Sequence, residues 1–164
     1  MNQMTNAQIQ QFKKRFEQGE IDIPKPKWAL SRKEAIAAKI PPHNSDYFEV
    51  SHLIKLTPLN SVIERLAPFY QKHLLNDNLF TPELNDRKIY RLYQLWKSNQ
   101  PVTPPVIRAF PSNGFLPDIE ILEGNHRIKL CLMNKVKSIP ILVEHRLSME
   151  IDPFKNSWFK KAKQ

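Results

Sequence analysis

Proline placement constrains this chain more than any other feature of its sequence. The 164 residues hold 14 prolines against 3 glycines. A proline lacks the backbone N–H that helix interiors and central strands need. Prolines interrupt the chain at positions 24–26, 41–42, 68, 101–105 and 111–117, and each segment between them suits one or two short elements. The sequence therefore predicts a loop-rich fold with stiff connections.

The composition predicts one folded module with appendages. Hydrophobic residues make up 41% and aromatic residues 10% of the chain, which argues against disorder. Cys131 is the single cysteine, so no internal disulfide can form, and the N-terminus lacks the order of a signal peptide. No apolar run approaches the length of a membrane helix. We therefore expect a cytoplasmic protein with no membrane partner and leave its oligomeric state open.

The net charge of +9 is concentrated near the two ends of the chain. Residues 13–33 hold seven basic and three acidic side chains, and residues 154–164 hold four basic and no acidic ones. Residues 34–153 are nearly neutral. Basic arms of this kind suit DNA or RNA phosphates without sequence preference. The alternative is that they are solvated ends that keep the protein soluble.

Three regions are expected along the chain. Residues 1–42 form a basic, helical N-terminal arm, with one helix capped by Asn6 and ending at Gly19, and a second capped by Ser31 and continuing to Lys39. Residues 43–153 form the main domain, and residues 154–164 form a basic, aromatic tail.

The main domain begins with a strand in the first half of residues 47–56. Thr57 and Pro58 then form a helix cap and first turn, and Pro68 either kinks that helix or starts a second one. A further helix is capped by Asn85 or Asp86 and ends before Pro101. Five of its side chains recur at helical spacing and should face the core: Ile89, Leu92, Tyr93, Leu95 and Trp96.

The following forty residues alternate between strand and helix patterns. Residues 106–110 and 118–123 read as two strands joined by a turn around Gly114, a hairpin-like pair. Gly124 ends the second strand, residues 126–134 have a helical apolar face, and residues 139–143 read as a buried strand. The fold class is therefore α/β (α+β), with helices packed on a small mixed sheet.

Four features coincide in this region: Pro104-Pro105-Val106-Ile107 before a strand, Ile119-Glu120-Ile121-Leu122 as a strand, the turn Glu123-Gly124-Asn125-His126-Arg127, and Ile139-Pro140-Ile141-Leu142-Val143. In this order they resemble the ParB/sulfiredoxin-like superfamily, which carries an acidic-Gly-x-x-Arg turn before a short helix and an Ile-Pro-Val-type strand. The likeness covers about forty residues closely. It implies that the turn binds nucleotide phosphate through Gly124 and Arg127.

The residues of the turn point to the same chemistry on physical grounds. A glycine between a strand and a helix leaves the helix N-terminal N–H groups free for an anion. Asn125 and His126 add polar side chains, and Arg127 adds a fork of donors that suits phosphate. The alternative is structural: Glu123 pairs with Arg127, Asn125 caps the helix and His126 is a satisfied surface residue.

Departures from the family pattern narrow the expected function. Sulfiredoxins carry a reactive cysteine where this chain has Asn125, and Cys131 lies on the apolar helix face, where an inert thiol is expected. Only about twenty residues follow Val143, too few for the DNA-reading domains of partition proteins. The resemblance thus implies a stand-alone module.

The superfamily implies several reactions for such a module. The leading expectation is a nucleoside triphosphatase or DNA nuclease that uses a nucleoside triphosphate and Mg²⁺. Glu123 is the first candidate for proton transfer or as a Mg²⁺ ligand, followed by Glu120 and His126. The alternatives are a non-catalytic module that binds nucleic acid or protein, and a small-molecule kinase of the same fold.

The C-terminal tail interleaves aromatic rings with lysines, as single-strand binders do. Its candidate nucleic-acid contacts are Lys155, Trp158, Lys160, Lys161 and Lys163. The alternative is a terminal helix that docks Phe154 and Trp158 on the core.

Overall fold

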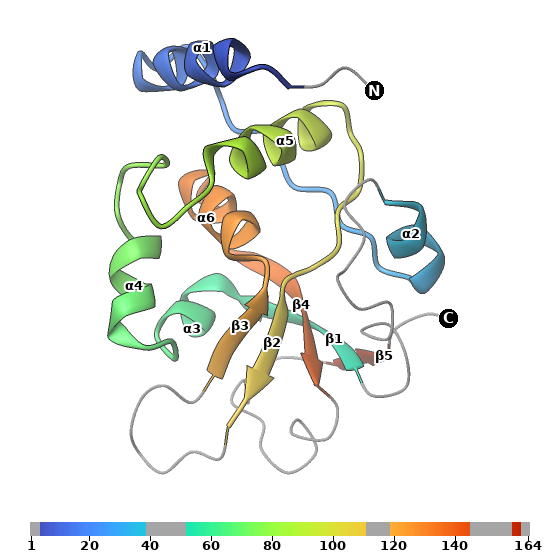
Figure 1. Ribbon diagram of the computed structural model, residues 1–164. Coiled ribbons are helices and arrows are strands. Elements are labelled where there is room, and N and C mark those ends of the chain that lie inside the picture. The colour runs from blue at the N-terminus through green and yellow to red at the C-terminus, as the bar shows by residue number, and fades with distance from the viewer. Residues whose placement is uncertain (1–3, 39–51, 111–118, 145–158, 162–164) are drawn as a thin grey trace.

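A computed structural model describes residues 4–38, 52–110, 119–144 and 159–161 of the chain (Figure 1). Its strands are β1 (His52–Pro58), β2 (Val106–Ala109), β3 (Ile119–Glu123), β4 (Ser138–Glu144) and β5 (Phe159–Lys161). Its helices are α1 (Asn6–Glu17), α2 (Arg32–Ala37), α3 (Leu59–Ile63), α4 (Pro68–Leu74), α5 (Asp86–Lys97) and α6 (Asn125–Met133).

The strands form one mixed sheet in the order β3-β2-β4-β1-β5. β2 and β3 are antiparallel neighbours, whereas β2 and β4 run parallel. β1 pairs antiparallel with β4 along its whole length, from His52 opposite Glu144 to Pro58 opposite Ser138. The predicted mixed α/β architecture is confirmed, as is the pairing of the two strands that flank residues 111–118. Those eight residues, including the turn predicted around Gly114, lie outside the described part of the chain.

The sheet buries apolar side chains on both faces. Ile139, Ile141 and Val143 of β4 belong to the main core, which also includes the apolar side of α5 and α6. Leu142, on the opposite face, lies in a second cluster with Ala35 of α2. This alternation follows from the two-residue repeat of a strand. Helices α5 and α6 thus cover one face, and α2 and the segment before it cover the other.

The N-terminal segment is packed onto the domain. In Figure 1, α1 lies across α5, which in turn lies above α6. The Phe12 ring lies 4.7 Å from the Tyr93 ring, and the Lys13 ammonium is 2.8 Å from the Asp86 carboxylate. Phe12 is 4% exposed and belongs to the main core. Residues 4–38 therefore share the core of the domain that follows them.

The start of α1 differs from the prediction by one residue. Thr5, and not Asn6, is the N-cap, because its hydroxyl accepts a hydrogen bond from the Gln8 N–H while the Gln8 side chain accepts one from the Thr5 N–H. This reciprocal pair is a capping box. Ser31 caps α2 as predicted, although α2 ends at Ala37.

The prediction for Thr57 and Pro58 was wrong. Both residues belong to β1, where Thr57 lies opposite Ile139, and α3 begins only at Leu59. Pairing with the long strand β4 extends β1 through the proline, and the Leu59 N–H then donates to the Lys137 carbonyl. Of the strand predicted early in residues 47–56, only the later residues are described, and β1 begins at His52.

Other helix boundaries were predicted correctly. α4 starts at Pro68, which settles the open choice in favour of a second helix. Asn85 caps α5 through a hydrogen bond from the Lys88 N–H to its side chain. All five side chains predicted to face the core from α5 are buried. In the described ranges, no helix is long and apolar enough to cross a membrane.

The described part of the C-terminal tail is a strand. Residues 159–161 form β5, which pairs antiparallel with β1 so that Lys160 lies opposite Ile54. A terminal helix over these three residues is therefore wrong, because the free edge of β1 offers backbone partners for an extended segment. Phe154, Lys155, Trp158 and Lys163 lie outside the described residues.

Candidate functional site

Gly124 makes the sharp connection between β3 and α6. Its φ of 111° is in the left-handed region, where residues with a side chain are strained. A Cβ atom at this position would lie 2.8 Å from both the Cα and the Cβ of Pro105, which is closer than real contacts allow. Pro105 precedes β2, so the glycine lets the turn approach the neighbouring strand. No other residue type fits here without a shift of the backbone.

The N-terminus of α6 has no side-chain cap among the described residues. Gly124 is the N-cap, so the proposed capping role of Asn125 is wrong. The side-chain oxygen of Asn125 is buried and has no hydrogen-bond partner in the described part of the chain. A buried polar atom without a partner is uncommon and calls for an explanation. The first N–H groups of α6 and this amide therefore lie together at the turn.

Arg127 and Glu123 form a buried ion pair across the turn. The Arg127 Nη2 lies 3.2 Å from the Glu123 Oε1, and the two side chains are only 6% and 8% exposed. Arg127 Nη1 also donates to the Pro104 carbonyl, at 3.4 Å. Burial lowers the pKa of Arg127, and the Glu123 charge opposes that shift. Arg127 thus ties the end of β3 and the start of α6 to the segment that enters β2.

His126 joins α6 to α5. Its Nε2 accepts a hydrogen bond of 2.9 Å from the backbone N–H of Asn85, the N-cap of α5. Burial, and then the charges of Lys88 and Arg127, lower the pKa of His126 to about 4. The ring is therefore neutral at pH 7, with its proton on Nδ1. It holds the start of α5 against the start of α6.

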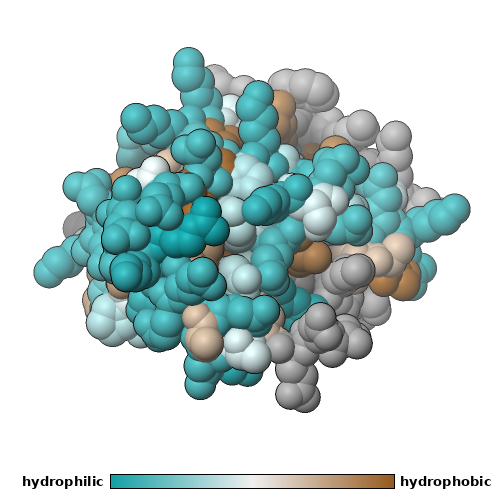
Figure 2. Space-filling view, turned by 90° about the horizontal axis from the view of Figure 1, so that it is seen from above, coloured by the Kyte–Doolittle hydropathy of each residue, from teal (hydrophilic) through white to brown (hydrophobic). Residues whose placement is uncertain are grey.

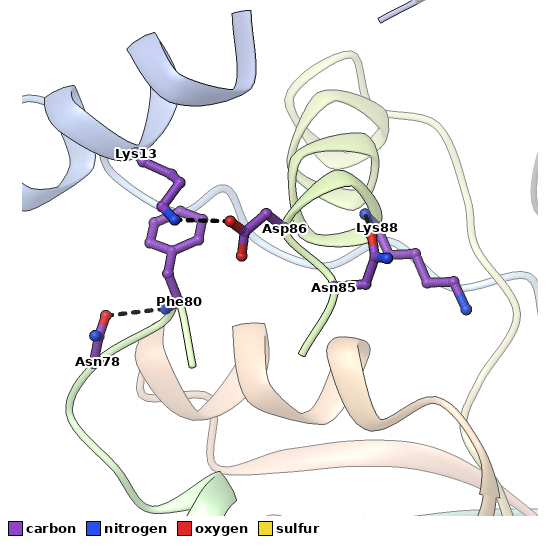
Figure 3. A network of polar contacts seen from close by, with 6 residues as sticks. All are labelled: Lys13, Asn78, Phe80, Asn85, Asp86 and Lys88. Atoms are coloured by element: carbon purple, nitrogen blue, oxygen red, sulfur yellow. Dashed lines mark hydrogen bonds and ion pairs between the residues drawn. The ribbon is translucent and has the colours of Figure 1, made fainter. Parts of the chain in front are cut away.

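The N-termini of two helices consequently meet at one place. Each carries the partial positive charge of a helix dipole. Figure 3 shows the start of α5, where Lys13 of α1 reaches Asp86 and Lys88 extends on the other side of the helix. Lys88 is exposed and close enough to affect the pKa of His126. Sequence reasoning missed Lys88 because nothing in the local pattern of α5 places it beside a turn so distant in the chain.

Glu120 does not lie with Glu123. Strand alternation places the two carboxylates on opposite faces of β3. Glu120 instead pairs with Arg108 of β2 at 3.2 Å, and both side chains are about two-fifths exposed. Of the predicted acid/base candidates, the structure therefore brings only Glu123 and His126 to the turn. No group of three or more His, Cys, Asp or Glu side chains that could hold a metal is found among the described residues.

Cys131 is an inert thiol, as predicted. It is fully buried in the main core, and burial raises its pKa to about 12. A thiol with this pKa remains protonated at neutral pH and is a poor nucleophile.

Among the predicted nucleic-acid contacts in the tail, Lys160 and Lys161 are described, and both lie in β5. Their backbones pair with β1 at the opposite edge of the sheet from β3. The described part of the tail and the turn therefore lie at opposite edge strands of the sheet.

Comparisons with known proteins identify no relative of this chain. No family model matches it, and no curated protein or solved structure is significantly similar. The resemblance to the ParB/sulfiredoxin-like superfamily accordingly stays a prediction from the motifs.

Proposed function

We propose that this protein binds phosphate groups of a nucleotide or nucleic acid at the turn Glu123 to Arg127. The observation that supports the proposal is the meeting of the α5 and α6 N-termini around a neutral His126. Both helix dipoles and the Lys88 charge favour an anion there, and the uncapped N–H groups of α6 are suitable donors. The motif resemblance, which rests on independent reasoning, points to the same ligand.

The residues of the turn divide into ligand contacts and supports. Gly124, Asn125 and the backbone of His126 would contact the phosphate, with Lys88 supplying charge. The motif predicts direct phosphate contact by Arg127. Its buried pairing with Glu123 and Pro104 favours a supporting role, in which it holds the Gly124 backbone in place. His126, which is neutral, adds no further positive charge beside Lys88 and Arg127.

Hydrolysis of a nucleoside triphosphate or cleavage of DNA is the second part of the proposal, supported by the position of Glu123. Its carboxylate is the only one among the acid/base candidates that lies at the turn. For Glu123 to bind Mg²⁺ or accept a proton, it would have to exchange its contact with Arg127 for one with the ligand or metal. The Glu123–Arg127 contact therefore favours binding, with turnover conditional on that exchange.

Calorimetric titration with adenosine triphosphate, with and without Mg²⁺, tests the proposal. Lys88→Glu should weaken binding by about tenfold, since a like charge then faces the phosphate. Lys88 is the third residue of α5, where glutamate favours helix formation, so a loss of binding would not reflect unfolding. Lys72→Glu makes the same change of charge at an exposed position of α4 and serves as the control. Equal affinity in both variants, or no binding by the unaltered protein, would refute the proposal. Phosphate release measured in the same samples tests turnover.

A further inference from the structure

A second positively charged surface lies along α5, away from the turn. Residues 87, 91 and 94 recur at helical spacing on its exposed side, and Lys97 and Tyr90 lie on the flank that faces α1. We call this surface the α5 ridge; it comprises Arg87, Tyr90, Arg91, Gln94 and Lys97. From the first to the last of these residues, ten residue steps cover about 15 Å of helix axis. Figure 2 shows the face that carries α1 and α5 from above, and hydrophilic side chains dominate it.

Basic side chains outnumber acidic ones on the ridge. It contains Arg87, Arg91 and Lys97, whereas the acid of α5, Asp86, lies outside it and pairs with Lys13 of α1 at 2.8 Å. Arg15 of α1 pairs with Glu20, and Lys14 and Glu17 are exposed. The α5 ridge itself therefore carries three basic side chains and no acidic one. A surface of this kind attracts a polyanion.

A shallow pocket of about 540 Å³ opens beside these charges. Tyr90, Tyr93, Gln94, Lys97 and Ser98 line it. The rings of Tyr90 and Tyr93 are nearly parallel, with an interplanar angle of 14°, and the Lys97 ammonium lies 5.6 Å from the centre of the Tyr93 ring. Tyr90 is half-buried and lines the pocket. An aromatic face beside an amide and a cation is a suitable environment for a nucleobase and its phosphate.

We propose that the α5 ridge binds single-stranded nucleic acid, with a base held at the Tyr90 pocket and the backbone following the basic side chains of α5. The chemistry of the pocket distinguishes this occupant from a duplex, whose bases are stacked inside and cannot reach a tyrosine. The proposal does not depend on ligand binding at the turn, because Lys88 and the turn residues are not part of the ridge.

An anionic membrane surface fits the ridge less well. Membrane-binding helices pair their charges with a broad exposed apolar face. The apolar side of α5 is instead buried in the core. Among the described residues, the large apolar side chains that are exposed lie outside α5: Leu30, Ile36, Leu56, Phe69, Tyr70 and Leu75. The ridge has charge and one aromatic pocket but no apolar face to insert.

Fluorescence anisotropy with a labelled oligothymidylate of about 15 nucleotides tests the proposal, a length within the range of known single-strand sites. The double variant Arg87→Gln/Lys97→Gln should reduce the slope of log affinity against log salt by about 1.4, because each lost phosphate contact on a single strand removes about 0.7. Lys72→Gln/Lys137→Gln removes the same charge from exposed positions on α4 and before β4 and should leave the slope nearly unchanged.

Two further measurements separate the remaining outcomes. Tyr90→Leu should weaken oligothymidylate binding by about five- to a hundredfold through lost stacking, while a duplex of equal length should bind the unaltered protein more weakly. Equal slopes in the two double variants would overturn the proposal, as would duplex binding as tight as single-strand binding. Binding to vesicles rich in phosphatidylserine without binding to the oligonucleotide would also overturn it. If Tyr90→Leu unfolds, the charge variants still decide the question.

Discussion

Gly124 illustrates how one residue is fixed by two independent requirements. Gly19 and Gly124 both have positive φ, but a Cβ at Gly19 would meet nothing within 4 Å, whereas at Gly124 it would meet Pro105. We expect Gly19→Ala to lower the free energy of unfolding by about 1 to 2 kcal/mol from backbone strain alone. Gly124→Ala should lose about 1 to 3 kcal/mol more through overpacking. Denaturant unfolding of both variants checks this, and equal losses would contradict the close approach to Pro105.

The Glu123–Arg127 pair is expected to be strongly coupled. Arg127→Met should lower the free energy of unfolding by about 3 to 5 kcal/mol, because it removes the positive charge beside the buried Glu123 carboxylate. Glu123→Gln in the same background should recover part of that loss, since the amide carries no charge. A double-mutant cycle measures the coupling, for which we expect about 0.5 to 3 kcal/mol. Additive effects would show that the two side chains act separately.

His126 should make the stability of the protein depend on pH. Its pKa is about 4 in the folded state and about 6.5 when unfolded, so the unfolded chain binds more protons between these values. The contribution of His126 is complete above pH 6.5 and declines as the pH falls towards 4. Allowing for the solvent around the partly exposed ring, we expect a loss of about 1 to 2 kcal/mol. His126→Gln should remove this component from the pH profile of unfolding; an unchanged profile would contradict the buried, neutral ring.

The polar roles at the turn were only partly predictable from sequence. Gly124 and Arg127 in one short turn suggested an anion site. Pairing of Glu123 with Arg127 was the structural alternative. The contact of His126 with Asn85 could not be foreseen, because it joins residues far apart in the chain. Burial of Lys129 was equally hidden: its ammonium donates to the carbonyls of Leu74, the last residue of α4, and Asn76. These hydrogen-bond partners are set by the packing of distant segments, which the sequence pattern of one segment does not reveal.

At the scale of elements, α5 is the best test of the core. Trp96 is 3% exposed, and its ring lies 5.5 Å from that of Trp28, edge to face. Trp96→Ala should lower the free energy of unfolding by about 3 to 5 kcal/mol, as expected for removal of a large buried side chain. Gln94→Ala, two residues earlier on the exposed side, is the matched control and should change stability by less than about 0.5 kcal/mol. Similar midpoints of chemical denaturation for the two variants would contradict the assignment.

Elements with a clear hydrophobic periodicity were predicted more accurately than strands whose bounds depend on pairing with other strands. α5, β2, β3, α6 and β4 were all predicted to within a residue or two, since each has a regular apolar pattern bounded by Pro, Gly or Asn. β1 and β5 were not, because they depend on one another and on β4 for their hydrogen bonds. Pro58 looked like a helix start from its neighbours alone, and only the register with β4 makes it the end of a strand.

At the scale of the whole molecule, the order of the elements brings both proposed surfaces onto one helix, α5. α5 contributes its N-terminus to the turn and its exposed side to the α5 ridge, while α1 covers its apolar flank through Phe12. The charge segregation seen in the sequence placed polyanion contacts in the two ends of the chain. The proposed α5 ridge lies instead in the region that is nearly neutral overall.

Nuclear magnetic resonance of ¹⁵N-labelled protein during titration with adenosine triphosphate tests the central claim most directly, because it reports on each backbone N–H separately. The largest shifts should fall on the amides of Gly124, Asn125, His126 and Arg127, with smaller shifts at the start of α5 around Asn85. Inorganic pyrophosphate should shift the same amides, since phosphate is the group recognised. Shifts confined to other parts of the chain, or none at concentrations that saturate known nucleotide sites, would contradict phosphate binding at the turn.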